Sequence, residues 1–83
     1  MPEPKTYPHL GLAIRALREE RQWRQSDLAE KVGVAAPYIS AMEAGKTNPE
    51  NMKLGTLERY ATAFDLHATD LIQMISQQEP AHD

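Results

Sequence analysis

Apolar residues recur along this chain at the spacings of short amphipathic helices. Leu10, Ile14 and Leu17 stand at i, i+4 and i+7, which predicts a helix from about residue 10 to residue 21. A second stripe, which predicts a helix of about two turns, consists of Leu28, Ala29 and Val32. The pattern therefore begins with two helices, with Trp23 in the link between them as a core plug rather than a ligand-stacking ring.

A sharp turn and a third helix follow the second stripe. Gly33 tolerates left-handed backbone, so it fits a turn directly after the helix, with Val34 returning to the core. Pro37 is compatible only with the first turn of a helix, so the next helix should begin at about Ala36, and Gly45 should end it. Two helices joined in this way form a helix-turn-helix, whose second member can enter the major groove of DNA.

The third helix has an inward and an outward face. The inward residues are Ile39, Met42 and Glu43. The outward ones are Ala36, Pro37, Ser40, Ala41 and Ala44, with Tyr38 at the edge. An inward carboxylate at the C-terminal end of a helix is costly, so Glu43 should have a cationic partner.

Two more helices are predicted after the Lys46–Pro49 loop. The core-facing residues of the fourth are Leu54, Leu57, Ala61 and Phe64, with Tyr60 beside them. His67 and Asp70 fit the N-cap and N3 positions of the fifth. The apolar residues of that helix point in more directions than one packed face can accommodate. Leu71 and Ile75 can face the core, which leaves Ile72 and Met74 without a place in it.

The surplus apolar residues predict a dimer interface. We expect a homodimer that pairs through the fifth helix, at Ile72, Met74 and Ile75. The alternative is that the chain's own N-terminal segment covers this face.

Composition places these helices in one small domain. The chain has 83 residues and no cysteine, which favours a reducing cytoplasm and excludes a disulfide framework. His9, His67 and His82 lack ligand spacing, so no metal site and no cofactor are expected. No apolar run is long enough for a membrane span or a signal peptide.

Charge is divided unevenly along the chain. Residues 1–53 hold eight Lys and Arg against seven Asp and Glu, a balance of +1, whereas residues 54–83 hold one against five, a balance of −4. The overall charge of −3 is unusual for a DNA-binding protein. A protein that binds DNA with its N-terminal half and pairs through its C-terminal half could carry this asymmetry, with modest, salt-sensitive affinity.

The domain boundaries follow from the ends of the pattern. Residues 1–9, with three prolines, should be a flexible arm, which is either a frayed terminus or a segment whose Lys5 and Tyr7 reach phosphate. Residues 10–76 form the folded domain, and residues 77–83 a disordered tail.

A set of residues at characteristic spacings resembles the Cro/repressor (XRE) helix-turn-helix family. They are Leu10-Gly11, Ile14-Arg15, Leu17-Arg18, Gln25, Leu28-Ala29, Gly33-Val34, Ile39-Ser40, Glu43, Gly45 and Pro49. The resemblance covers roughly residues 10–72 and implies an all-α, compact five-helix, lambda-repressor-like DNA-binding domain. It also implies that Arg18 is the structural ion-pair partner of Glu43.

The predicted DNA contacts divide into phosphate contacts and base contacts. Phosphate is expected at the start of the second helix, where free N–H groups favour anions, and in the loop after the third: Arg24, Gln25, Ser26, Lys46, Thr47 and Asn48. The resemblance marks Gln25 as a backbone contact. The base-facing residues are Ala36, Pro37, Tyr38, Ser40 and Ala41, where relatives place more polar side chains. We therefore expect thymine methyl contacts, a few hydroxyl contacts and DNA deformability to carry recognition of a double-stranded operator.

Two other classes of function are the alternatives to a DNA-binding regulator. An enzyme is disfavoured, because a helical domain of this size without cysteine, clustered histidine or a Gly-rich loop has little place for a catalytic pocket. A protein-interaction module, such as an antitoxin that binds a toxin or an anti-repressor, would account for the acidic balance and the apolar recognition helix. The residues do not distinguish a phage repressor, a restriction-modification controller, an autoregulatory antitoxin and a housekeeping regulator.

Overall fold

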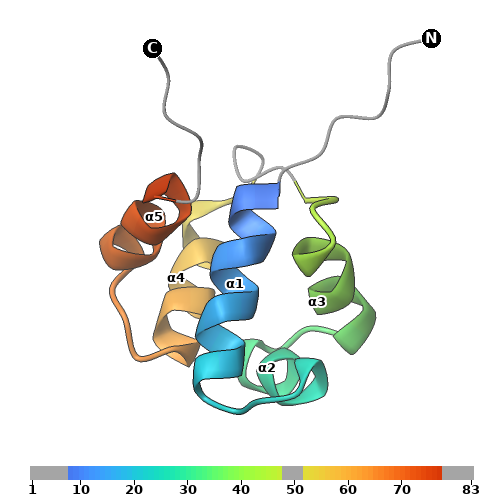
Figure 1. Ribbon diagram of the computed structural model, residues 1–83. Helices are drawn as coiled ribbons and strands as arrows, with labels where there is room; N and C mark the ends of the chain where they lie inside the picture. Colours follow the sequence, from blue (N-terminus) through green and yellow to red (C-terminus); the bar gives the residue numbers. More distant parts are fainter. Residues whose placement is uncertain (1–7, 48–51, 78–83) are drawn as a thin grey trace, which may run out of the picture.

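The computed structural model describes residues 8–47 and 52–77, and within these ranges the chain forms helices and no strand (Figure 1). The helices are α1 (Pro8–Glu20), α2 (Gln25–Val32), α3 (Ala36–Glu43), α4 (Leu54–Ala63) and α5 (Ala68–Gln77). Helix α1 lies between α3 and α5, with α2 across its C-terminal end and α4 behind it (Figure 1). The predicted five-helix, all-α fold is confirmed.

Helix α1 begins earlier than the periodicity predicted. It starts at Pro8, so Pro8 and His9 belong to the helix and not to the predicted arm. Proline is favoured in the first helical turn, where its missing N–H would have no intrahelical partner. Likewise, Gln77 belongs to α5 rather than to the tail. The rest of the predicted arm and tail lies outside the described residues.

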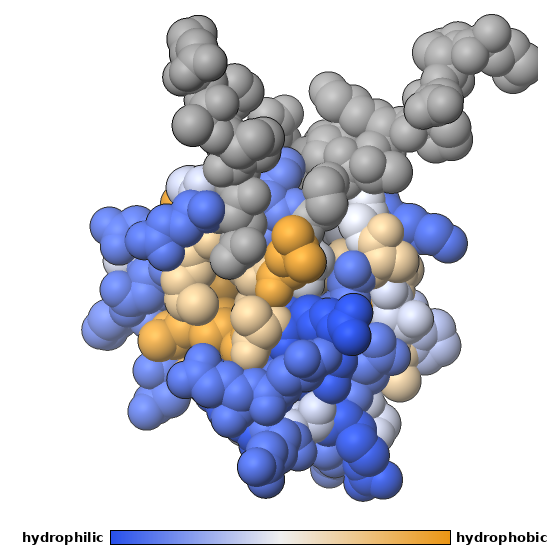
Figure 2. Space-filling model, viewed as in Figure 1, coloured by the Kyte–Doolittle hydropathy of each residue, from blue (hydrophilic) through white to orange (hydrophobic). Residues whose placement is uncertain are grey.

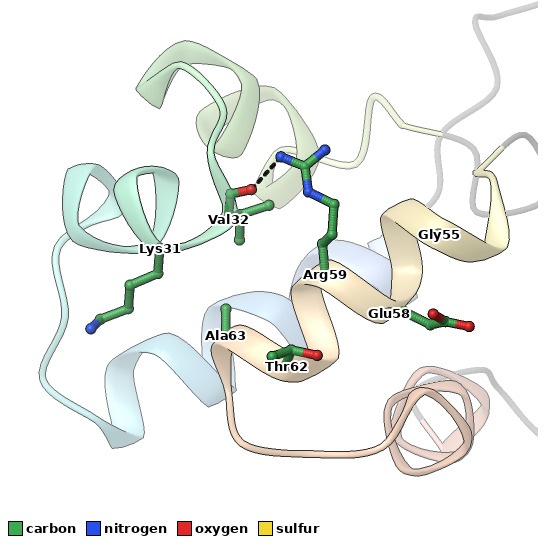
Figure 3. A pocket seen from close by; sticks show the side chains of 7 residues that line it. All are labelled: Lys31, Val32, Gly55, Glu58, Arg59, Thr62 and Ala63. Carbon is green, nitrogen blue, oxygen red and sulfur yellow. Dashed lines mark hydrogen bonds between the residues drawn. The ribbon is translucent and has the colours of Figure 1, made fainter.

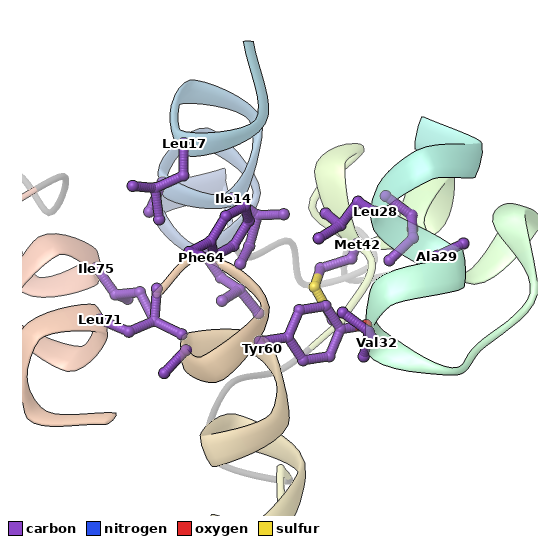
Figure 4. Close-up of a cluster of buried hydrophobic side chains, with 14 residues drawn as sticks. Ile14, Leu17, Leu28, Ala29, Val32, Met42, Tyr60, Phe64, Leu71 and Ile75 are labelled. Atoms are coloured by element: carbon purple, nitrogen blue, oxygen red, sulfur yellow. The ribbon is translucent and has the colours of Figure 1, made fainter. Parts of the chain in front are cut away.

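The core lies where the five helices meet (Figure 4). Its buried residues are Leu10, Ala13, Ile14, Leu17, Leu28, Ala29, Val32, Ile39, Met42, Tyr60, Ala61, Phe64, Leu71 and Ile75. Every helix contributes to this single cluster, so the α2–α3 pair cannot be separated from the rest of the domain without exposing apolar surface.

The prediction that Leu54 faces the core is wrong. Its side chain is 63% exposed, because it opens α4 one turn before the helix reaches the core. Tyr60, predicted only to stand beside the stripe, is fully buried instead. Leu57 is partly buried, while Ala61 and Phe64 lie in the core as predicted.

Trp23 fills the corner between α1, α2 and α4, as predicted. Its ring stacks on Phe64 with a centroid separation of 5.8 Å and an interplanar angle of 12°. The Lys31 ammonium lies 4.7 Å from the centroid of the Trp23 ring, within the range of a cation–π contact. Arg21 closes the same corner by donating to the carbonyls of Leu17, at 3.0 Å, and Phe64, at 2.8 Å.

Candidate nucleic-acid interface

Helices α2 and α3 are joined by a turn of three residues, Gly33–Ala35. Gly33 has φ +86°, the left-handed conformation predicted for it. The amides of Gly33 and Val34 both donate to the carbonyl of Ala29, at 2.8 and 2.9 Å, which closes the C-terminal end of α2. The predicted helix-turn-helix is therefore present.

The inner face of α3 is fixed by apolar packing and by one ion pair. Ile39 and Met42 are fully buried. Arg18 of α1 donates to both carboxylate oxygens of Glu43, at 2.7 and 2.9 Å, and also to the carbonyl of Trp23, at 2.7 Å. The side chains of this pair are only 13% and 6% exposed, and the hydrogen bond to Glu43 raises the pKa of Arg18. The predicted pair of Arg18 and Glu43 is confirmed.

A glycine on α1 lets this helix approach the end of α3 closely. A Cβ atom placed at Gly11 would lie 2.6 Å from the backbone oxygen of Glu43 and 2.7 Å from that of Met42. Any larger residue would push the two backbones apart. The C-terminal end of α3 is thus held by direct backbone contact as well as by charge.

The outer face of α3 is accessible. Pro37, Tyr38 and Ser40 are exposed, while Ala36 and Ala41 are partly buried at the margins of this face. Ala35, the N-cap of α3, offers its helix no side-chain hydrogen bond. The orientation matches the prediction for Pro37, Tyr38 and Ser40, whereas Ala36, predicted to face outward, packs partly against the core. Contact of all five residues with DNA stays a prediction.

The predicted phosphate contacts at the start of α2 have different surroundings. Ser26 is exposed, and the Arg24 side chain is 83% exposed. Gln25 donates to the Glu43 carboxylate at 3.3 Å, so its side chain is already bound to the end of α3. Asp27, which the sequence analysis missed, accepts a hydrogen bond from the Arg24 amide at 2.8 Å. This bond lowers the pKa of Asp27 and satisfies one N–H at the helix start.

The loop after α3 is only partly described. Gly45 has φ +82° and its amide donates to the carbonyl of Met42 at 3.0 Å, which ends the helix near the predicted place. Lys46 is exposed and Thr47 is partly buried. Asn48, the third predicted phosphate contact, lies outside the described residues.

The predicted dimer residues on α5 are not equally accessible. Ile72 is 44% exposed, but Met74 is partly buried against the core and Ile75 is buried in it. Ile75 is thus a core residue with little surface for a partner, and the contact of Ile72 and Met74 with a second copy stays a prediction. Leu12 of α1, which the sequence analysis did not single out, is 52% exposed. Hydrophobic surface gathers where α1 meets α5, left of centre in Figure 2, while the surface over α2 is hydrophilic.

Comparison with known proteins identifies the domain. The model of the helix-turn-helix domain family matches residues 9–72, from the start of α1 into α5. The chain belongs to the helix-turn-helix domain family. The predicted resemblance to Cro/repressor-type regulators is confirmed, and this family of transcription regulators is not enzymatic.

Named relatives in the helix-turn-helix family are regulators of several kinds. The transcriptional regulator DdrOP3 of Deinococcus deserti is 37% identical over 60 residues, covering 72% of this chain and 44% of the relative. Antitoxin HigA1 of Mycobacterium tuberculosis is 42% identical over 53 residues, covering 64% of this chain and 34% of the relative. The chain thus spans less than half the length of either curated relative.

A relative of known structure has the same fold as this chain, and the likeness extends over nearly the whole length of the relative. The restriction-modification controller protein C.AhdI of Aeromonas hydrophila superposes with a TM-score of 0.68 at 28% identity. The alignment covers 78% of this chain and 94% of the controller protein.

Within residues 8–47 and 52–77, neither a metal-binding cluster nor a membrane-spanning helix is present. No group of three or more His, Asp or Glu side chains there could hold a metal ion. No helix in these ranges is long and apolar enough to cross a bilayer.

Proposed function

We propose that this chain is a sequence-specific, double-stranded-DNA-binding transcriptional regulator, a repressor or autoregulator, that acts as a homodimer. In this proposal α3 enters the major groove. The observation that carries it is the contrast between the two faces of α3. Its inner face is fixed by Ile39, Met42 and the Arg18–Glu43 pair, while its outer face is open.

The open face favours contacts with methyl groups and a few hydrogen bonds. Ala36, Pro37 and Ala41 have apolar side chains, which suit the C5-methyl group of thymine. Tyr38 and Ser40 are exposed hydroxyl donors for base edges or phosphate. Arg24 and Ser26 at the start of α2, and Lys46 after α3, are exposed and would contact phosphates. Gln25 would do so from a side chain already anchored on Glu43.

Selection of bound fragments from a genomic library, followed by fluorescence anisotropy, tests this function. The Tyr38→Ala/Ser40→Ala double variant is expected to bind the selected duplex at least about tenfold more weakly than the parent. Thr62→Ala, which removes an exposed hydroxyl from α4, is the matched control and should stay within about twofold of the parent. Affinity of the parent should fall steeply as salt rises.

Two results would contradict the function separately. A parent that binds selected and scrambled duplexes equally is not sequence-specific. A parent that binds no duplex at low salt is not a DNA-binding protein on its own.

The homodimer is proposed from the apolar surface shared by α1 and α5. Leu12 and Ile72 are large side chains that remain about half exposed there. A helix-turn-helix protein commonly binds two half-sites about 34–36 Å apart, which requires two copies. A second copy that covers this surface would bury both side chains and leave α3 of each copy free.

Sedimentation equilibrium at micromolar concentration tests the dimer. The parent should sediment as a dimer and Ile72→Glu as a monomer, because a carboxylate would be desolvated in the interface. Gln73→Glu is the matched control. It adds the same charge at the next residue of α5, which is also exposed, but removes no apolar side chain. A monomeric parent, or an Ile72→Glu variant that stays dimeric, would contradict this interface.

A protein-binding role is the second candidate, favoured by the similarity to antitoxin HigA1 and by the charge of −4 in residues 54–83. Salt dependence separates the two roles. Binding to DNA should weaken steeply with ionic strength, whereas an apolar protein contact should not.

A further inference from the structure

Arg59 of α4 reaches out of its own helix to the end of α2 (Figure 3). Its Nη2 atom donates to the carbonyl of Val32, the last residue of α2, and lies 3.5 Å from the carbonyl of Gly33. Among the described residues, no carboxylate forms an ion pair with Arg59. The Arg59 side chain therefore binds backbone carbonyls at the end of α2 and in the α2–α3 turn.

The contact with Arg59 gives the C-terminal end of α2 a hydrogen-bond donor for a carbonyl that has none within the helix. The last carbonyls of a helix have no intrahelical partner and form the negative end of its dipole. The turn's own hydrogen bonds, from the amides of Gly33 and Val34, both go to Ala29 and leave the Val32 carbonyl to Arg59. A guanidinium at this point adds both a donor and a favourable charge.

The turn and the guanidinium are also closely fitted in space. A Cβ atom placed at Gly33 would lie 2.8 Å from Arg59 Nη2. Glycine at this position thus serves the left-handed backbone and admits the arginine. The turn in question sets the direction in which α3 leaves α2.

We propose that Arg59 is a positioning residue for DNA recognition, which fixes the angle of α3 by holding the α2–α3 turn from α4. This inference rests on the function proposed above. A recognition element must be held within a fraction of an ångström to discriminate between sites. Loss of Arg59 should therefore reduce discrimination between specific and non-specific DNA rather than DNA binding in general.

Arg21 provides a matched control for this inference. It too donates to two backbone carbonyls, those of Leu17 and Phe64, but at the ends of α1 and α4, away from the α2–α3 turn. Arg59→Met and Arg21→Met each remove one positive charge and one carbonyl-binding guanidinium. Arg21→Met also removes the cation–π contacts of Arg21 with Trp23 and Phe64, so it is the more severe loss of contacts and a stringent control.

The experiment measures the ratio of affinities for the selected and a scrambled duplex, at a temperature where both variants are fully folded. Arg59→Met should lose about tenfold in this ratio, while Arg21→Met should stay within about twofold of the parent. Hydrogen exchange without DNA should show faster exchange of the Gly33 and Val34 amides in Arg59→Met only.

The outcomes separate this inference from the proposed function. An Arg59→Met ratio equal to that of the parent or of Arg21→Met, with the parent binding DNA normally, overturns the inference alone. Unchanged exchange of the turn amides in Arg59→Met also overturns it. A parent that binds no duplex overturns the proposed function and, with it, this role of Arg59.

Discussion

Helix α1 packs against α3 on one side and α5 on the other, and the two contacts are built differently. Towards α3 it uses the close backbone approach at Gly11 and the ion pair from Arg18 to Glu43. Towards α5 it meets the buried side chains of Leu71 and Ile75. The first contact is directional and the second is apolar.

The difference shows which helix must be held at a fixed angle. Charge-assisted, bidentate hydrogen bonds work only in a narrow geometry, whereas hydrophobic burial depends little on direction. The directional contacts lie on the candidate recognition helix. The apolar contact lies on the helix that completes the core and extends its apolar surface outward at Ile72.

Removing Arg18 should break the directional contact with the largest effect. Arg18→Ala leaves the Glu43 carboxylate, whose side chain is 6% exposed, without its main partner. A loss of roughly 3–5 kcal/mol in the free energy of unfolding is expected, a large part of the roughly 4–12 kcal/mol expected for a domain of this size. Urea denaturation measures it.

The control for this substitution is an exposed pair on the same helix. Arg15 and Glu19 are joined at 2.6 Å, but their side chains are 61% and 53% exposed. Arg15→Ala should therefore melt close to the parent. A melting curve of Arg18→Ala that also matches the parent would show that the ion pair does not hold α3.

Gly11 and Gly55 differ in the space available for an added side chain, and this difference tests the close contact of α1 with α3. Gly11→Ala should cost about 1–3 kcal/mol, because its Cβ would lie within 2.7 Å of two α3 carbonyl oxygens. Gly55→Ala in α4 meets nothing within 4 Å and should stabilise the protein by about 0.4–1 kcal/mol. Denaturation of both variants under one condition should give opposite signs, and equal signs would contradict the close approach of α1 to α3.

Within the described residues, the core holds one buried hydroxyl without a partner, which should destabilise the fold. The Tyr60 hydroxyl is buried and has no hydrogen-bond partner among the described residues. Tyr60→Phe is therefore expected to stabilise the protein by about 1 kcal/mol. A destabilised variant would show that the hydroxyl has a partner.

The same hydroxyl predicts a loss of stability in alkali. Burial raises the pKa of Tyr60 above its ordinary value of 10.0, so above that pH the unfolded chain releases a proton that the folded one keeps. The parent should lose stability relative to Tyr60→Phe as the pH rises beyond 10. Paired thermal melts at about pH 7 and about pH 11 measure this difference.

The smallest effect is expected at an exposed directional contact, between Asp27 and the Arg24 amide. Because that amide lowers the pKa of Asp27, the carboxylate stabilises the fold above its ordinary pKa of 3.8, and this contribution is lost as the pH falls below it. Asp27→Asn should melt slightly below the parent at neutral pH, and the gap should close in acid. A gap that does not depend on pH would exclude a charge effect.

The sequence predicted most of what depends on local periodicity. The five helices, the left-handed Gly33, the first-turn Pro37 and the inward Ile39 and Met42 all follow from short-range rules, and the structure agrees. The Arg18–Glu43 pair was predicted because an inward carboxylate needs a partner and the resemblance supplied it.

What the sequence missed depends on distance across the fold. Arg59 lies 27 residues from the Val32 carbonyl that it binds, and no spacing rule connects a side chain to a distant backbone oxygen. The need for a small residue at Gly11 is set by α3, and the exposure of Leu54 by the point where α4 reaches the core. Leu12 was missed because it lies off the stripe of Leu10, Ile14 and Leu17 from which the first helix was predicted.

The single tryptophan makes the molecule its own optical reporter. The Trp23 indole is stacked on Phe64 and flanked by Lys31, where the segment after α1 meets α4. Its emission should change when that corner opens, so every fluorescence titration of unfolding follows one known site. Arg24, the next residue, is one of the proposed phosphate contacts, so the same emission should also respond when a duplex binds the folded protein.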